Sequence, residues 1–154
     1  MFSILKKPVL PFILLLSIML FVSCGDDDPV TPQEEHFEAI GTVIYNATGA
    51  EIARILRGVT TDTLSAQVGV LSDHYRVKFI NDDEEIVDPP ENDEMSMEVV
   101  ITDTNLLETE TDEPGGFEFH LRGKAPGITS IEIKILHSGH SDYRSGLIPV
   151  KIEN

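Results

Sequence analysis

The stretch Ile131-Glu132-Ile133-Lys134-Ile135, near the end of the chain, alternates apolar and charged residues at every step. Successive side chains of a β-strand point to opposite faces, so the three isoleucines share one face while the two charged residues share the other. This alternation predicts a strand that packs one face on a hydrophobic core and turns the other to solvent.

The same period of two recurs along the chain, between segments rich in Gly, Pro, Asn and Asp. Residues 52–59 also fit a helical face, but their β-patterned neighbours and the nearby Gly58 favour a strand. About eight or nine short strands, with turn signals about every 8 to 12 residues, predict an all-β fold with a single β-sandwich over residues 36–154. The other alternating sets are Phe37, Ala39, Gly41, Val43 and Tyr45; Leu64, Ala66 and Val68; Tyr75, Val77 and Phe79; Met95, Met97, Val99 and Ile101; Phe117, Phe119 and Leu121; and Ile148, Val150 and Ile152.

One hairpin carries a family resemblance. The stretch from Leu121 to Ile133, with Gly123 and Gly127 around its turn, resembles the penultimate hairpin of bacterial immunoglobulin-like domains, in which a Gly-bearing turn leads into a Thr/Ile-rich strand. The resemblance implies an immunoglobulin-like β-sandwich. It covers a small part of the domain and transfers no function.

The first 23 residues have the three parts of a secretory signal peptide. Lys6 and Lys7 form the charged head, an almost wholly apolar run extends over residues 9–22, and Ser23 precedes the expected cut. The run of about 14 residues is shorter than the roughly 20 that a helix needs to cross a bilayer core. The pattern therefore predicts a cleaved signal peptide over residues 1–23.

The junction that follows contains the only cysteine of the chain. Phe21-Val22-Ser23-Cys24 resembles the lipobox of bacterial lipoproteins, which implies that Cys24 becomes the acylated N-terminus and binds the lipid bilayer. The alternative is a buried or disulfide-bonded cysteine, but a lone cysteine cannot form an intramolecular bridge. In such lipoproteins an Asp directly after the Cys can retain the protein at the inner membrane, and Gly25 stands at this position instead. Residues 26–28 resemble the surface-export signals of Bacteroidota lipoproteins, which implies an outer-membrane, cell-surface location unless this Asp run is only a solvated linker.

Residues 24–35 are polar and acidic and contain two prolines, which predicts a flexible tether behind the lipid. Without residues 1–23, 9 basic and 27 acidic residues remain, a net charge of −18. This charge excludes general nucleic-acid binding, which needs a basic surface. It also repels anionic lipid headgroups, so the acyl chains must supply the anchoring.

The segment His137-Ser138-Gly139-His140-Ser141-Asp142 joins the two clearest strands. Imidazole nitrogens and carboxylate oxygens are zinc ligands at about 2.0 to 2.2 Å, and Gly139 gives the loop the freedom to fold back. By strand alternation His137 points inward, whereas His140 falls in the loop. The segment predicts a Zn or Cu site formed by His137, His140 and Asp142.

His36 and Glu38, on the first predicted strand, are the candidates for completing this metal site, because first and last strands often meet in a sandwich. Two alternatives stay open: a turn held by His and Asp hydrogen bonds, and a site for another ligand. The acidic segment 81–94 lacks the spacing and the Gly of an EF-hand and is interpreted as solvated. The glycosylation pattern Asn46-Ala47-Thr48 is interpreted as a turn.

Enzyme motifs are absent from the sequence: it has no nucleophile elbow, phosphate-binding loop or HExxH helix. Two function classes therefore remain. The first is a non-enzymatic, membrane-anchored binding or accessory module, a partner of a larger outer-membrane protein complex. The second is a lipoprotein that binds a divalent metal at the histidine segment.

Overall fold

Ten β-strands and no helix form the part of the chain that this computed structural model describes, residues 36–91 and 93–154. The all-β prediction is thereby confirmed. The predicted signal peptide, Cys24 and the tether lie outside the described residues. Within the described ranges, no helix is long and apolar enough to span a membrane.

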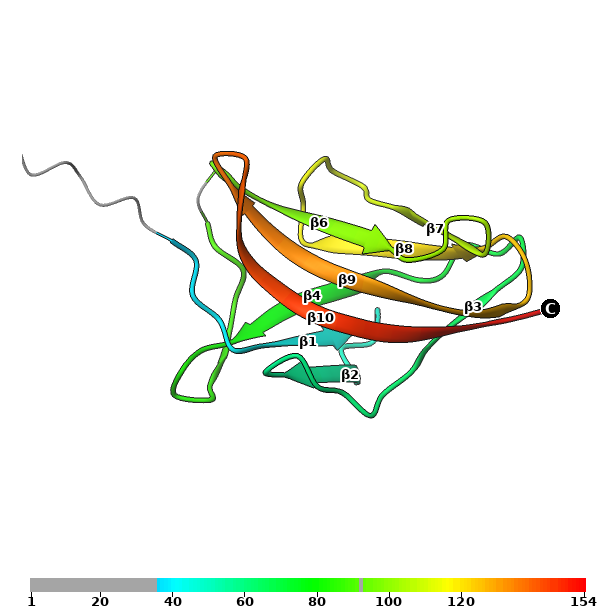
Figure 1. The fold of residues 1–154 in the computed structure, drawn as a ribbon, viewed down its shortest axis with the longest axis horizontal. Helices are drawn as coiled ribbons and strands as arrows, with labels where there is room; N and C mark the ends of the chain where they lie inside the picture. Colours follow the sequence, from blue (N-terminus) through cyan, green and yellow to red (C-terminus); the bar gives the residue numbers. More distant parts are fainter. Residues whose placement is uncertain (1–35, 92) are drawn as a thin grey trace, which may run out of the picture. The chain divides into compact units, whose positions relative to one another are not determined.

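The strands form two sheets (Figure 1). The six-stranded sheet contains β1 (Gly41–Tyr45), β2 (Glu51–Leu56), β4 (Tyr75–Ile80), β5 (Ile86–Val87), β7 (Leu107–Glu110) and β8 (Glu118–Gly123). The four-stranded sheet contains β3 (Leu64–Gln67), β6 (Met95–Ile101), β9 (Gly127–His137) and β10 (His140–Glu153). The orders are β2-β1-β4-β8-β7, with β5 beside β4, and β3-β10-β9-β6. The β3–β10 pair is parallel and the other strand pairs are antiparallel.

The core lies between the two sheets and contains most of the residues that the alternation predicted. On β1 the predicted face is wrong: Thr42 and Ile44 face the core, and Val43 and Tyr45 do not belong to it. All three isoleucines of the opening stretch are fully buried, and their charged neighbours face outward. They pack with the inward residues of β4 and β8, among which Phe79 and Phe119 are the largest fully buried side chains. A core shared by two facing sheets is the defining feature of a β-sandwich. The immunoglobulin-like topology remains a prediction.

Strand β10 changes the face it buries part-way along its length. Tyr143 and Ser145 are buried in its first half, but Ile148 is buried in its second half, so the inward parity switches. The switch occurs at a register shift where Gly146 has a φ of 83°. An extra residue in a strand of period two exchanges the faces of all later residues. Ser145 Oγ stabilises the irregularity by accepting the Ile133 N–H and donating to the Gly146 carbonyl.

Several strand boundaries differ from the expectations. Residues 36–40 belong to no strand although Phe37 packs against the core, so the first strand begins only at Gly41. This is one residue after Ile40, whose amide donates to the Ile80 carbonyl of β4. Residues 51–56 form strand β2, as favoured over a helix. The short strands β5 and β7 raise the count to ten from the expected eight or nine, since two to four residues show no clear period.

Candidate metal centre

The chain enters the described domain beside the start of β10. His36 Nδ1 lies 3.1 Å from Asp142 Oδ1, and the Phe37 amide donates to Asp142 Oδ2 at 2.9 Å. The first and last strands do meet, as guessed from the sequence, but they face each other across the sandwich and do not pair. The buried hydrogen bond of 2.7 Å between Thr42 Oγ1 and the Tyr143 hydroxyl joins them within the core.

Asp142 owes its position to a second irregularity of β10. Ser141 pairs with Leu136 and Tyr143 with Ile135, so Asp142 is an extra residue without a partner in β9. Such bulges redirect a side chain out of the regular alternation. Here the bulge aims the carboxylate at the entering segment 36–37.

The Asp142 carboxylate is almost completely covered, with 4% of its side chain exposed. Burial alone raises its pKa, but the hydrogen bonds from the Phe37 amide and His36 outweigh burial and lower the pKa below its ordinary value. Each of these two hydrogen bonds favours the charged form of the carboxylate. Asp142 is therefore an anion at neutral pH, as a metal ligand must be.

His137 is the last residue of β9 and points inward, as the alternation predicted; 7% of its side chain is exposed. Its Nδ1 lies 3.5 Å from Asp142 Oδ2, and its Nε2 lies 3.5 Å from Glu94 Oε2. The ring stands edge-on to that of His36, with centroids 6.3 Å apart. A carboxylate on the far nitrogen is a common support for a metal-binding histidine.

These three side chains can reach one ion. Ligand atoms of His36, His137 and Asp142 all lie within 4.8 Å of one another. In a tetrahedral zinc site with bonds of about 2.0 to 2.1 Å, two ligand atoms are separated by about 3.3 to 3.4 Å. The separations of 3.1 and 3.5 Å fall on either side of this value. The same contacts also serve the hydrogen-bonded turn that the sequence left as an alternative.

Two residues of the predicted set lie outside this group. His140 begins β10 as an exposed residue at the tip of the hairpin, and Glu38 is exposed in the unpaired entry segment. The grouping of His36, His137 and Asp142 does not include either of them. Strand alternation separates the inward His137 from His140 in the loop, but it does not predict that the bulge turns the Asp142 carboxylate toward His36.

A second histidine-carboxylate group, which the sequence did not indicate, lies on the six-stranded sheet. It consists of His74, Asp112 and His120. The three residues come from separate segments of the chain. Only the pairing of β4 with β8 brings the two histidines together.

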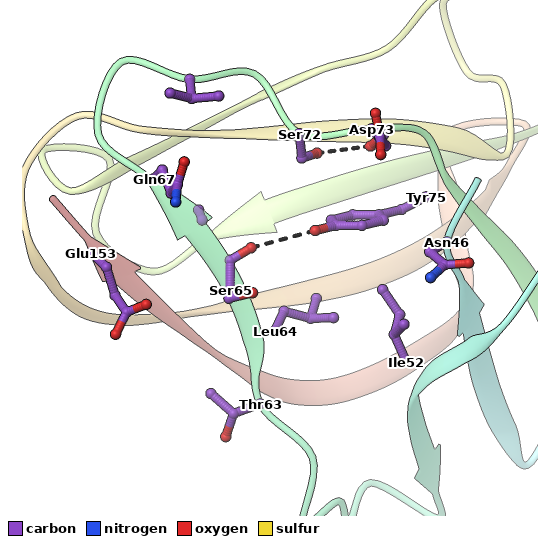
Figure 2. Close-up of a pocket in the computed structure, with 12 residues that line it drawn as sticks. Asn46, Ile52, Thr63, Leu64, Ser65, Gln67, Ser72, Asp73, Tyr75 and Glu153 are labelled. Carbon is purple, nitrogen blue, oxygen red and sulfur yellow. Dashed lines mark hydrogen bonds between the residues drawn. The ribbon is translucent and has the colours of Figure 1, made fainter. Parts of the chain in front are cut away.

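An open pocket of about 580 Å³ lies between edge strand β3 and the start of β4 (Figure 2). The Tyr75 ring lies along it, and the Tyr75 hydroxyl donates to the Ser65 carbonyl at 3.3 Å. Asp73 and Glu153 add carboxylates to the lining, which includes no histidine. The pocket shares no residue with either histidine group.

Comparisons with known proteins identify no family. No protein-family model and no curated protein matches this chain. Among solved structures, domains 4 and 5 of the S-layer protein SbsC are similar, with a TM-score of 0.43 and 17% identity. The match covers 60% of this chain and 47% of that one, so the chain spans about half the length of the matched structure. A likeness of this size carries no argument about function.

Proposed function

We propose that this chain is a lipid-anchored, non-enzymatic binding module of the bacterial outer membrane, which binds a divalent transition-metal ion through His36, His137 and Asp142. The convergence of these three ligand atoms within 4.8 Å is the observation that carries the proposal. The residues come from the entry segment, the end of β9 and the bulge of β10.

The ligand types favour Zn²⁺ or Cu²⁺. Imidazole suits zinc and copper, whereas Ca²⁺ and Mg²⁺ prefer sites built wholly from oxygen. Two imidazoles and one carboxylate supply three ligands, so a fourth position is left for water or for a group on a partner molecule. Asp142 contributes its charge, and Glu94 supports His137 from the other side of the ring.

Binding is proposed in place of catalysis because of where the group lies. Small-molecule substrates are usually bound in concave pockets. The linings of the two described pockets, of about 580 and 300 Å³, include none of the three residues. This placement agrees with the absence of enzyme motifs from the sequence.

The anchor places this site near a membrane. Twelve residue steps separate Cys24 from His36, and a fully extended chain of that length reaches at most roughly 40 Å. Acylation of Cys24 therefore keeps the bound ion within that distance of the bilayer. The Asp run behind Cys24 supports export to the outer membrane. Such a module presents its metal ion to molecules close to the surface.

The test is metal binding by the full chain in detergent, with Cys24→Ser so that no unacylated Cys24 thiol competes for the ion. Isothermal titration with ZnCl₂ and with CuCl₂ gives affinity and stoichiometry. His36→Ala should remove one bound ion or weaken its binding at least tenfold. His140→Ala is the matched control, because it removes an exposed imidazole of the same hairpin that lies outside the group. If His36→Ala bound the metal as tightly as the Cys24→Ser protein with all its histidines, the assignment would be refuted. So would the absence of metal binding at micromolar concentration.

A further inference from the structure

The outer face of the six-stranded sheet carries two neighbouring imidazoles. Tyr75 pairs with Phe119 and Arg76 with Glu118, so the β4–β8 register places His74 beside His120. Their ring centroids are 4.3 Å apart, at an interplanar angle of 57°. His74 directly precedes β4 and His120 lies within β8, so the strand pairing at Tyr75 and Phe119 positions the two histidines.

His120 is held with one nitrogen turned toward a carboxylate. Its Nδ1 lies 2.8 Å from the Ser72 carbonyl oxygen, which can only accept, so Nδ1 carries the proton. In the neutral ring Nε2 then presents its lone pair, and this atom lies 3.5 Å from Asp112 Oδ1. A backbone carbonyl on one nitrogen is a typical way to orient a histidine that binds metal through the other. Only 9% of the His120 side chain is exposed, so the ring is fixed by its surroundings.

Two carboxylates complete the surroundings of His74. Asp112 Oδ2 lies 3.1 Å from His74 Nδ1, and Glu118 Oε2 lies 3.6 Å from the same nitrogen. The other Glu118 oxygen faces Arg76 Nε at 3.3 Å. These separations are close to the distance of about 3.3 to 3.4 Å between ligand atoms in a tetrahedral site with bonds of about 2.0 to 2.1 Å.

We propose that His74, His120 and Asp112, with Glu118 as fourth ligand, form a second site for a divalent transition-metal ion, with Zn²⁺ as the preferred occupant. Ligand atoms of the first three residues all lie within 4.8 Å of one another. Two imidazoles and two carboxylates match the tetrahedral nitrogen and oxygen ligation of zinc. The two carboxylate charges balance the ion, and Arg76 is the nearby cation that offsets part of the Glu118 charge.

The ion has access from solvent. Asp112 and Glu118 line an open pocket of about 300 Å³, together with Glu113, Gly116 and Phe117. Both carboxylates are about half exposed, whereas His120 is covered. Binding would tie the segment after β7 to β8 and to the residue before β4. This second site shares no residue with the first and does not rest on it.

The experiment uses the full chain in detergent with Cys24→Ser, titrated with ZnCl₂, with X-ray absorption at the zinc edge to count imidazole ligands. The Cys24→Ser protein with all its histidines should bind two zinc ions. His74→Ala and Asp112→Asn should each remove one ion or weaken its binding at least tenfold, without affecting the ion that His36→Ala removes. Both substitutions change half-exposed residues, and far-UV circular dichroism checks that the fold is retained.

Glu113→Gln is the matched control for Asp112→Asn. Glu113 is the next residue along the chain and lies outside the ligand set, so its substitution removes the same charge without removing a ligand. It should leave the stoichiometry at two. Equal losses from Asp112→Asn and Glu113→Gln would show a diffuse acidic surface and overturn the second site. So would unchanged zinc binding in His74→Ala. If the protein bound a single ion that only His36→Ala removed, the second site would be overturned and the first would stand. If only His74→Ala and Asp112→Asn removed that ion, the first site would be overturned and the second would stand.

Discussion

The hydrogen bond between Thr42 and Tyr143 links the two sheets next to the candidate site, and its contribution to stability can be measured. The two hydroxyl oxygens are 2.7 Å apart, Thr42 is fully buried, and the Tyr143 ring packs edge-on against Phe79 at a centroid distance of 5.5 Å. Tyr143→Phe keeps the ring and removes only the hydroxyl. It therefore leaves Thr42 without this partner inside the core.

An unsatisfied buried hydroxyl costs about 1 to 3 kcal/mol, so Tyr143→Phe should lower the free energy of unfolding by that amount. Thr42→Val should cost a similar amount, because it leaves the Tyr143 hydroxyl without this partner. The double variant replaces both hydroxyls by apolar groups of similar shape, which is close to neutral. It should therefore be more stable than the sum of the two single losses implies, by about 1 to 3 kcal/mol.

Urea unfolding of the four proteins, followed by far-UV circular dichroism, gives this coupling energy. Losses that add within about 0.5 kcal/mol would refute the idea that the two hydroxyls depend on each other. The pH dependence supplies an independent check. Burial raises the pKa of Tyr143 to about 12, although the Thr42 hydrogen bond acts in the opposite direction.

The sign of the pH effect follows from comparing folded and unfolded states. The unfolded phenol has a pKa of about 10, so keeping it neutral in the fold stabilises the protein fully below pH 10. The pKa values of the folded and unfolded states differ by about two units, which corresponds to about 3 kcal/mol of stability. This stability is lost as the pH rises from about 10 to about 12. Tyr143→Phe lacks this titration, so its stability should fall less steeply over that interval. Parallel pH profiles for the two proteins would contradict the assigned burial.

Three further predictions test the anchor, the bulge and the core. Cys24→Ser should move the protein from the membrane fraction to the soluble fraction, and a variant that stays with the membrane would contradict lipidation. Gly146→Ala places a Cβ 2.9 Å from backbone at a φ of 83°, so it should lower thermal stability more than Gly49→Ala, which has a φ of 82° and open space around it. Ile133→Ala, at a fully buried position, should cost about 2 to 5 kcal/mol in urea unfolding. Ile128→Ala, 73% exposed on the same strand, should change stability by less than about 0.5 kcal/mol.

The regular part of the fold was readable because burial on one face imposes a period of two on the sequence. This holds for β9, where the inward isoleucines and outward charges follow the alternation without a break. Strand β7 was missed because only Leu107 among its four residues is buried, so its charged residues hide the period. Strand β10 was predicted only in its second half, since the bulges at Asp142 and Gly146 each shift the parity.

The candidate site was predictable in part for the same reason. His137 follows the alternation of β9, and its inward orientation could be inferred by counting from Ile135. The orientation of Asp142 could not, because it depends on an unpaired residue that leaves no mark in the composition. Whether His36 or Glu38 would face the site depends on an entry segment that belongs to no strand. Local sequence carries little information about such a segment.

The two histidine groups differ in what determines their geometry, and this difference bears on how each would respond to an ion. The β4–β8 register places His74, the residue before β4, beside His120 of β8, and the Ser72 carbonyl holds the His120 ring. The sheet holds the two histidines of that site in place before an ion binds. The main effect of binding would therefore be to fix the exposed Asp112 side chain. His36, by contrast, is 58% exposed, and its hydrogen bond to the domain is to the bulged Asp142, which also accepts the Phe37 amide. An ion shared by His36, His137 and Asp142 would therefore join the end of the tether to the hairpin of the sandwich. Binding at this site would be coupled to how the proposed lipid anchor holds the domain, whereas binding at the other site would act within the domain alone.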